Sequence, residues 1–147
     1  MIEKKLTIST AESCTGGMIA GNLINYPGIS EVFLEGAVTY SNEAKHKRLG
    51  VKNETLDKYG AVSGETAREM AIGIANTAGT DVSIVTTGIA GPDGGTLEKP
   101  VGLVYIGVYV QGEVIVKKHI FNGNRSRIRL QATITGLDML RRILIKK

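Results

Sequence analysis

The sequence predicts an α/β fold, a three-layer α/β/α sandwich built on a mixed β-sheet. Short apolar strands alternate with amphipathic helices along the chain, and such an alternation places helices on both faces of a sheet. A hairpin late in the chain adds antiparallel strands, so the sheet should be mixed. The 147 residues, 42% of them hydrophobic, show no linker or repeat, which predicts a single domain over residues 1–147.

The first elements are predicted to be a strand, a tight turn and a helix. The stretch "KLTIST", Lys5 to Thr10, is rich in β-branched residues and predicts a strand. It leads into "TAESCTGG", whose small residues and glycine pair are typical of a turn. Apolar residues at helical spacing predict a helix from Gly16 to about Asn25, which "YPG" ends.

A second strand followed by a short helix is predicted next. The strand covers "FLEGAVTY", Phe33 to Tyr40. In the following "SNEAKHKRLG", Ser41 or Asn42 can cap a helix that Gly50 ends. This places a polar segment directly at the end of a strand.

A longer helix and a buried strand follow. Ser63 is a plausible cap for the helix in "SGETAREMAIGIANTAG", and one face of this helix should cover the sheet with Ala67, Met70, Ala71 and Ile74. The apolar run Val82 to Thr86 predicts a buried strand, which runs into the irregular, glycine-rich "GIAGPDGG".

The last third of the chain predicts a hairpin and a long helix. The segments "VGLVYIGVYV" and "EVIVKKHIF" flank a turn at Gln111 and Gly112. The helix should run from about Asn124 to Ile145. Its predicted apolar stripe consists of Leu130, Ile134, Leu137, Leu140 and Leu144.

Charge and composition favour a small anionic partner. The formal charge of +4 is modest, and a phosphate-bearing small molecule suits it as well as nucleic acid does. The basic runs Lys45–Arg48 and Arg125–Arg129 contain no stacking aromatic residues and no nucleic-acid-binding motif. We therefore expect solvated helix faces at most of these positions and no nucleic-acid partner.

The sequence indicates neither a disulfide, a metal site nor a membrane segment. Cys14 is the only cysteine, and the histidines, His46 and His119, lie far apart without metal-ligand spacing. No signal peptide and no span of about 18 apolar residues is present. A protein of the reducing cytoplasm, without bound metal, is the expectation.

Three polar loops each follow a predicted strand: "AESCTGG", "TYSNEAK" and "TTGIAGPDGG". Ligands of open α/β sheets bind outside the carboxyl ends of strands, so these loops can converge on one site. Within the first loop Ser13, Cys14 and Thr15 are all candidate nucleophiles. No glycine-Xaa-serine-Xaa-glycine elbow surrounds Ser13, because Glu12 precedes it.

A serine nucleophile needs a base, and Lys45 is the candidate that the loops offer. It must lose about 3 units of pKa to be neutral at pH 7, and burial together with the cationic neighbours Lys47 and Arg48 would lower its pKa. Tyr40 could pass the proton through its hydroxyl. Structural roles remain open at this point, with Lys45 as a solvated helix residue and Tyr40 as a half-buried strand aromatic.

Several long strings resemble those of the CinA carboxy-terminal domain family, which includes nicotinamide-nucleotide amidohydrolases. They are "TAESCTGG", "GAVTYSNEAK", "GAVS", "GIAGPDGGTLEKPVGLVYIGV" and "FNGNRSRIRLQA", and the likeness runs from about Lys5 to the end. The resemblance implies a nicotinamide mononucleotide deamidase of the pyridine nucleotide cycle. It implies a metal-independent serine-lysine mechanism without a cofactor, on a pyridine nucleotide as substrate.

Residue by residue, the resemblance implies that Ser13 is the nucleophile, Lys45 the general base and Tyr40 a hydroxyl that assists proton transfer. Cys14 is then a packing residue. The residues expected to bind substrate fall in three groups. They are Thr15, Gly16 and Gly17 as an oxyanion hole at a helix start, Thr87, Gly88 and Gly91 in the glycine-rich loop, and Arg125 and Arg129 as phosphate ligands.

One departure from the family is the absence of its usual helix ahead of the first strand, where only Met1 to Lys4 stand. We therefore expect a partner chain to cover one side of the sheet, which favours a homodimer. The alternative function is a catalytically inactive module of the same fold that binds nucleotide or serves in competence or damage responses.

Overall fold

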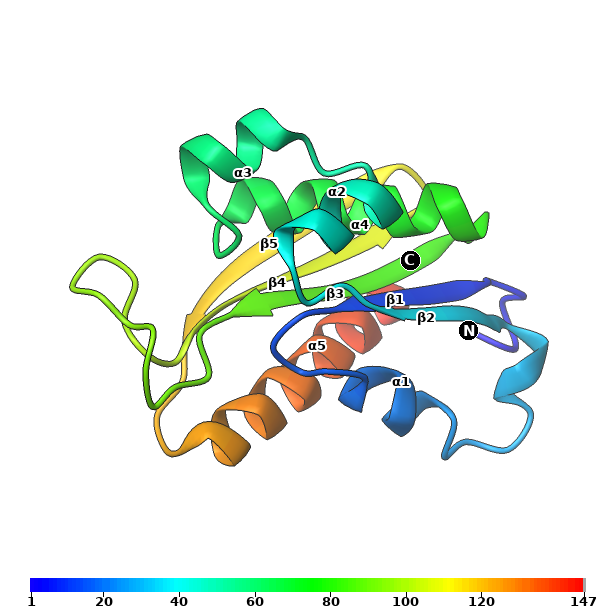
Figure 1. Cartoon of the computed structure of the whole chain (residues 1–147). Coiled ribbons are helices and arrows are strands. Elements are labelled where there is room, and N and C mark those ends of the chain that lie inside the picture. The colour runs from blue at the N-terminus through cyan, green and yellow to red at the C-terminus, as the bar shows by residue number, and fades with distance from the viewer. Residues whose placement is uncertain (147) are drawn as a thin grey trace.

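A mixed five-stranded sheet forms the centre of the molecule (Figure 1). The computed structural model describes residues 1–146. The strand order is β2-β1-β3-β4-β5, with β1, β2 and β3 parallel and β4 and β5 antiparallel to their neighbours. The bounds are β1 Ile8–Glu12, β2 Phe33–Val38, β3 Val82–Gly88, β4 Leu103–Val110 and β5 Glu113–Ile120.

Helices cover both faces of this sheet, which confirms the three-layer prediction (Figure 1). One face carries α2, α3 and α4, and the other carries α1 and α5. Their bounds are α1 Met18–Leu23, α2 Asn42–Leu49, α3 Asn53–Tyr59, α4 Gly64–Ala78 and α5 Arg125–Lys146, and a short 3-10 helix spans Ile29–Glu31. Helices of the same chain therefore lie on both faces, and the expected homodimer stays a prediction.

The first strand begins and ends later than predicted, at Ile8–Glu12 instead of Lys5–Thr10. The side chain of Asp81 accepts hydrogen bonds from the backbone N–H and the hydroxyl of Thr7, both at 2.9 Å, just before the strand begins. All five strand residues are buried, Glu12 included. A carboxylate inside a buried strand departs from the usual strand pattern, so the apolar signal in the sequence stops before the strand does.

The last helix confirms part of its predicted apolar stripe. Leu140 and Leu144 are buried and Leu137 packs against the same cluster, whereas Leu130 and Ile134 are 47% and 57% exposed. The other buried residues of this helix are Ile128, Ala132, Thr133, Gly136 and Met139. A Cβ atom added at Gly136 would lie 3.3 Å from Ile84 and 3.5 Å from Ile106, so the small residues let the helix approach the sheet closely. In its first half the helix therefore buries small residues instead of Leu130 and Ile134.

The remaining predicted elements are confirmed with small shifts, and one helix was missed. Ser41 and Ser63 cap α2 and α4 by accepting N–H bonds from Ala44 and Thr66. The turn between β4 and β5 has positive φ at Gln111 and Gly112, as two-residue hairpin turns require. The missed helix is α3, whose "NETLDKY" has too few apolar residues to show a helical period.

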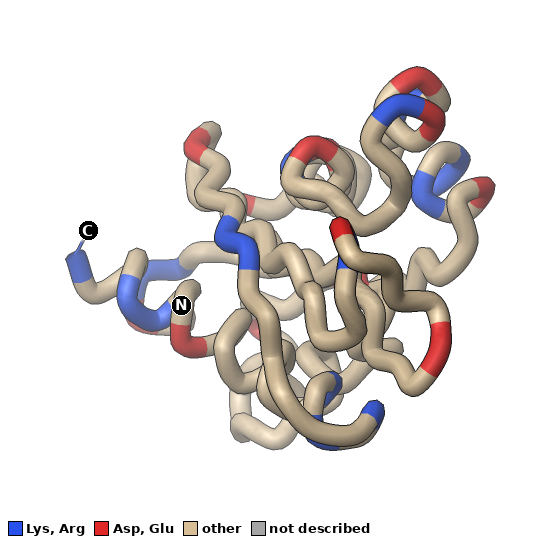
Figure 2. Tube along the Cα trace, turned by 90° about the vertical axis from the view of Figure 1, so that its left-hand side faces the viewer, with Lys and Arg blue, Asp and Glu red and all other residues tan. Residues whose placement is uncertain are grey.

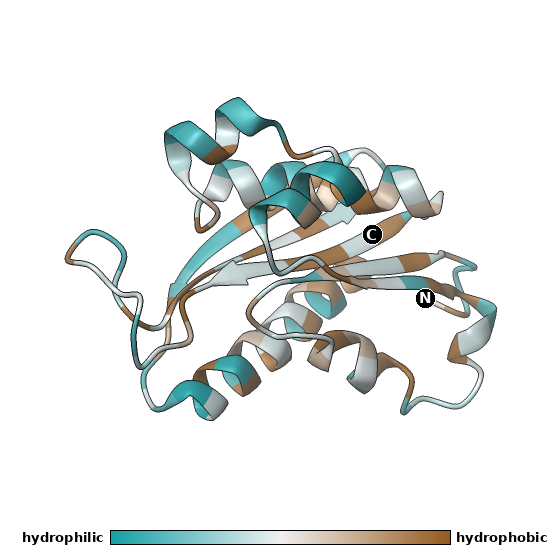
Figure 3. Cartoon of the chain, in the orientation of Figure 1, coloured by the Kyte–Doolittle hydropathy of each residue, from teal (hydrophilic) through white to brown (hydrophobic). Residues whose placement is uncertain are grey.

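Two apolar clusters fill the space between the layers. One lies between the sheet and α1 with α5, and the other lies between the sheet and α2 with α4. Figure 3 shows the apolar positions on the strands and on the helix sides that face them. The second cluster brings α4 so close to α2 that a Cβ atom at Gly73 would lie 1.9 Å from the carbonyl oxygen of Leu49.

This close approach predicts that Gly73→Ala destabilises the fold by about 1–3 kcal/mol, because backbone must move to admit the methyl group. Gly21→Ala is the matched control, since Gly21 lies inside α1 with no atom within 4 Å of an added Cβ. That variant should gain about 0.5–1 kcal/mol from helix propensity. Urea unfolding measures both changes, and equal effects of the two substitutions would contradict the close contact.

Candidate functional site

A cavity of about 260 Å³ lies at the carboxyl ends of β1, β2 and β3, where the polar loops were expected to converge. The residues that line it come from the loops after these strands, from the segment before α4 and from the start of α5. They are Ser13, Cys14, Tyr40, Lys45, Ala61, Val62, Thr87, Gly88, Ile89, Ala90, Gly91, Asp93, Gly94 and Arg125. Seven of the predicted site residues therefore meet in one cleft, and four do not line it.

The Ser13 turn is organised by the buried carboxylate of Glu12. Glu12 is 1% exposed, and its two oxygens accept bonds from the Thr15 hydroxyl at 2.6 Å and from the N–H groups of Ile19 and Ala20 at 2.8 and 3.1 Å. The residue before α1 supplies no side-chain cap, so a strand residue performs that task. Sequence reasoning missed this role, although a carboxylate in an apolar strand was a visible signal.

Arg129 supports the same turn from α5 and does not line the cleft. Its guanidinium donates to the carbonyl oxygens of Cys14 at 2.9 Å and Thr15 at 3.2 Å. In the structure Arg129 thus holds the backbone of the Ser13 turn, whereas the resemblance implied that it binds the phosphate.

The oxyanion hole expected at Thr15, Gly16 and Gly17 is not formed by these residues. Thr15 is fully buried, with its hydroxyl between Glu12 and Thr86, and none of the three lines the cleft. The N–H of Gly16 donates to the carbonyl of Ser13, and the N–H groups in the first turn of α1 donate to Glu12. The N–H of Gly16 is thus engaged within the protein, and the cleft lining gives the oxyanion-hole prediction no support.

Lys45 lies on α2 with its amine turned into the protein beside Ser13. The side chain is 1% exposed, so the solvated alternative is wrong. Its Nζ lies 3.1 Å from the Ser13 hydroxyl oxygen, 2.9 Å from the Thr39 carbonyl oxygen and 3.1 Å from the Tyr40 carbonyl oxygen. The end of β2 and the first turn of α2 together hold the amine in this position.

Burial lowers the pKa of Lys45 below its ordinary value, while the nearby Cys14 acts in the opposite direction. The expected help from neighbouring cations is absent, because Lys47 projects into solvent and pairs with Glu43. Both carbonyl oxygens can only accept hydrogen bonds. A neutral amine has two N–H groups for these carbonyls, which leaves its lone pair for the hydroxyl proton of Ser13.

Cys14 is poorly placed to act as the nucleophile. Its side chain is 5% exposed, and burial raises the pKa of its thiol to about 11. The thiolate, and not the thiol, is the reactive form, so Cys14 is inert near neutral pH. This arrangement favours Ser13, as the sequence analysis expected.

Tyr40 lines the cleft, but its hydroxyl does not reach the amine of Lys45. The ring is 62% exposed, and the hydroxyl accepts a bond from Arg125 at 3.2 Å. Only the carbonyl of Tyr40 contacts Lys45. The proton path expected through the hydroxyl is therefore not assembled, and the ring instead forms a wall of the cleft beside a guanidinium.

The opposite wall is formed by the glycine-rich loop after β3. Arg125 donates to the carbonyl of Gly91 at 2.8 Å, and Thr87 donates to the carbonyl of Ala61 at 2.6 Å. Asp93 also lines the cleft and adds a carboxylate that sequence reasoning did not single out. An arginine and an aspartate at one cavity suit a ligand with both an anionic and a cationic group.

The two histidines lie outside this cleft. His46 contacts the carbonyl of Val51, and His119 on β5 stacks on Phe121.

Within residues 1–146, no group of three or more His, Cys, Asp or Glu side chains is arranged to hold a metal ion. Over the same residues, no helix has the length and apolar character needed to cross a membrane. Acidic and basic positions are interspersed in Figure 2.

The chain is similar in sequence to a known protein family and to proteins of other organisms. The CinA C-terminal domain family matches residues 1–144. A competence-damage inducible protein of Clostridium beijerinckii is 84% identical over 146 residues, and one of Clostridium acetobutylicum is 63% identical over 145. Each alignment covers 99% of this chain but only 36% and 35% of the relative, so the chain spans about a third of their length.

Solved structures with the same architecture include the competence/damage-inducible protein CihA of Agrobacterium tumefaciens. It is 44% identical, has a TM-score of 0.93, and the match covers 99% of this chain and 88% of that one. A CinA superfamily protein of Escherichia coli is 35% identical with a TM-score of 0.93, over 97% of this chain and 83% of that one. These proteins share both the fold and a substantial part of the sequence.

The buried Lys45 predicts a specific pH dependence of stability. Because its pKa in the folded protein is lowered from 10.5, the unfolded chain binds more protons at any pH between the folded value and 10.5. The free energy of unfolding of wild type, relative to Lys45→Met, should therefore rise with pH across that window and level off above it. Lys47→Met, at an exposed position, is the control, and its difference from wild type should show no such rise. If the difference in free energy of unfolding between wild type and Lys45→Met did not change with pH, a lowered pKa of Lys45 would be contradicted.

Proposed function

The chain belongs to the CinA C-terminal domain family, and from this premise we propose that it is a nicotinamide mononucleotide deamidase. The reaction converts nicotinamide mononucleotide and water into nicotinate mononucleotide and ammonia. The observation that carries the proposal is the buried Lys45 amine, 3.1 Å from the Ser13 hydroxyl oxygen and held by two carbonyl groups. This pair has the form of an activated nucleophile with its base.

Acylation begins when the neutral amine of Lys45 takes the hydroxyl proton of Ser13. The Ser13 oxygen attacks the carboxamide carbon, and the carbonyl oxygen gains negative charge. The N–H groups of Ala90 and Gly91 are the proposed donors to this oxygen, since both residues line the cleft and neither N–H donates a bond within residues 1–146. The Lys45 ammonium then donates its proton to the departing nitrogen, ammonia leaves, and an ester joins Ser13 to the nicotinoyl group.

Deacylation uses the same groups in the reverse order. Neutral Lys45 takes a proton from a water molecule, whose oxygen attacks the ester carbon. The Ser13 oxygen leaves and recovers a proton from Lys45. The new carboxyl group gives its remaining proton to solvent, and the product departs as a carboxylate. The Thr39 and Tyr40 carbonyls stabilise the ammonium each time it forms, because both accept its N–H groups.

The charges around the cleft suit this substrate. Its pyridinium nitrogen withdraws electrons from the carboxamide and so assists attack without a metal. Arg125 is the proposed phosphate ligand, because it lies at the cleft mouth and offers a forked donor. The Asp93 carboxylate complements the positive ring or the ribose hydroxyls.

Ammonia release from nicotinamide mononucleotide by the purified protein tests the proposal. Ser13→Ala and Lys45→Ala should each lower kcat/KM at least about a hundredfold, because each removes a member of one proton-transfer unit. Cys14→Ala is the matched control. It changes the neighbouring side chain in the same turn and should retain most activity.

The alternative, an inactive nucleotide-binding module, is favoured by one observation. None of Thr15, Gly16 and Gly17, the residues expected to stabilise the oxyanion, lines the cleft, and the N–H of Gly16 already donates to the carbonyl of Ser13. If wild type releases no ammonia while nicotinamide mononucleotide raises its melting temperature, the deamidase proposal fails and the binding module is retained.

Arg125 predicts a dependence on the substrate phosphate. Arg125→Ala should raise KM for nicotinamide mononucleotide about tenfold or more, the loss expected for a charge-assisted hydrogen bond. The KM for nicotinamide riboside, which has no phosphate, should change much less. Steady-state ammonia assays on both substrates measure this difference, and an equal change for the two would show that Arg125 does not bind the phosphate.

A further inference from the structure

The two edges of the sheet differ in the way they face solvent. The edge strand β5 carries Glu113, Lys117 and Lys118, and such charges protect an edge from pairing with another strand. The other edge strand, β2, reads "FLEGAV", with Glu35 as its one charge and no proline. Leu34 and Val38 on β2 are each 53% exposed. An apolar, unprotected edge of this kind favours association through backbone hydrogen bonds.

A groove runs along this edge beneath α2. The backbone of β2 pairs with β1 on one side, and its other side is the free edge of the sheet. The groove is lined by Gly36, Ala37, Val38 and Thr39 and by Lys47 and Arg48 of α2, among others. The β2 edge forms one side of the groove, and the basic residues of α2 form the other. It can therefore receive an extended segment that carries an acidic side chain.

We propose that this groove receives β2 of a second copy of the chain, antiparallel across a two-fold axis at Gly36, so that one sheet continues through both copies. This register places Gly36 opposite Gly36 of the second copy and Glu35 opposite its Ala37. A two-fold axis at Glu35 would instead place two carboxylates opposite each other, which is unfavourable. With the axis at Gly36 the strand is therefore complementary to itself, as a two-fold interface requires.

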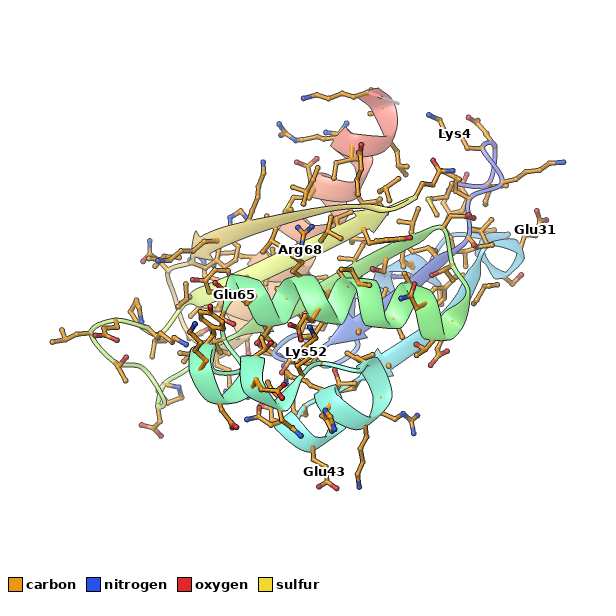
Figure 4. The ribbon with its side chains drawn as sticks, turned by 90° about the horizontal axis from the view of Figure 1, so that it is seen from above. Lys4, Glu31, Glu43, Lys52, Glu65 and Arg68 are labelled. Carbon is orange, nitrogen blue, oxygen red and sulfur yellow. The ribbon has the colours of Figure 1, made fainter. Side chains whose placement is uncertain are left out.

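Charge complementarity identifies Arg48 as the residue that meets the incoming Glu35. Ala37 packs in the apolar cluster between the sheet and α2 with α4, and Glu35 points to the same face because it is two residues away. Glu35 of the second copy, opposite Ala37, thus points toward α2. Lys47 already pairs with Glu43, which Figure 4 shows projecting outward, whereas Arg48 makes no ion pair within residues 1–146.

The proposed interface lies next to the candidate site. β2 leads directly into Thr39 and Tyr40, whose carbonyl groups hold the Lys45 amine. Pairing of β2 with a second copy would fix the strand that presents these two carbonyls. The proposed interface does not depend on the proposed deamidase function. It is tested by the molecular mass of the protein in solution, which can be measured whether or not the protein is active.

Sedimentation equilibrium on the purified chain tests the interface. Wild type should have twice the 15.7 kDa chain mass. Glu35→Arg places two arginines opposite each other, and Arg48→Glu places two glutamates opposite each other. Because each pair occurs twice across the axis, either variant should raise the dimer dissociation constant at least about a hundredfold. Circular dichroism checks that both variants stay folded.

An equimolar mixture of the two variants gives the decisive measurement. In the mixed dimer, position 35 of one copy again faces an opposite charge at position 48 of the other copy. One of the two pairs is the native Glu35 with Arg48, and the other has the two charges exchanged, so dimers should form again. Lys117→Glu on the opposite edge strand is the control and should remain dimeric. A monomeric wild type, a dimeric single variant or a mixture that stays monomeric would each overturn the proposed interface.

Discussion

The arrangement of the site depends on keeping the Lys45 amine away from water. Burial destabilises the ammonium form, and the carbonyl groups of Thr39 and Tyr40 hold the amine at the distance where it meets the Ser13 hydroxyl. Thr39 and Tyr40 follow β2 directly, and Ser13 directly follows β1, which pairs with β2. The parallel pairing of two strands therefore sets the geometry of the base and the nucleophile, and any change in their register would separate them.

A second buried group, Glu12, holds the other half of the site. Its carboxylate closes the start of α1 and fixes the Thr15 hydroxyl, while Arg129 reaches from α5 to the carbonyl groups of the same turn. A buried charge is costly unless hydrogen bonds compensate it, and three donors do so for Glu12. Hydrogen bonds from both α1 and α5 thus hold the turn around Ser13 in place.

Most elements of the fold were predictable because their signals are local. Caps at Ser41 and Ser63 and the Gln111-Gly112 turn follow from a few neighbouring residues. Leu130 and Ile134 were predicted to share one apolar stripe with the buried Leu140 and Leu144, yet they are exposed, because helical period cannot distinguish between two apolar faces. Close approach at Gly136 decides between them, and that depends on the opposing strands.

By itself, the sequence determined the fold class, the convergence of three loops on one cleft and the pairing of Ser13 with Lys45 as candidates. The tertiary structure decided which hydrogen-bonding groups remain available for a ligand. Thr15 and Arg129 are engaged inside the protein, and the Tyr40 hydroxyl meets Arg125 instead of Lys45. Residue spacing predicts which side chains come near one another. Which donor and acceptor actually pair depends on distances of a few tenths of an ångström between segments far apart in the chain, and only packing sets these.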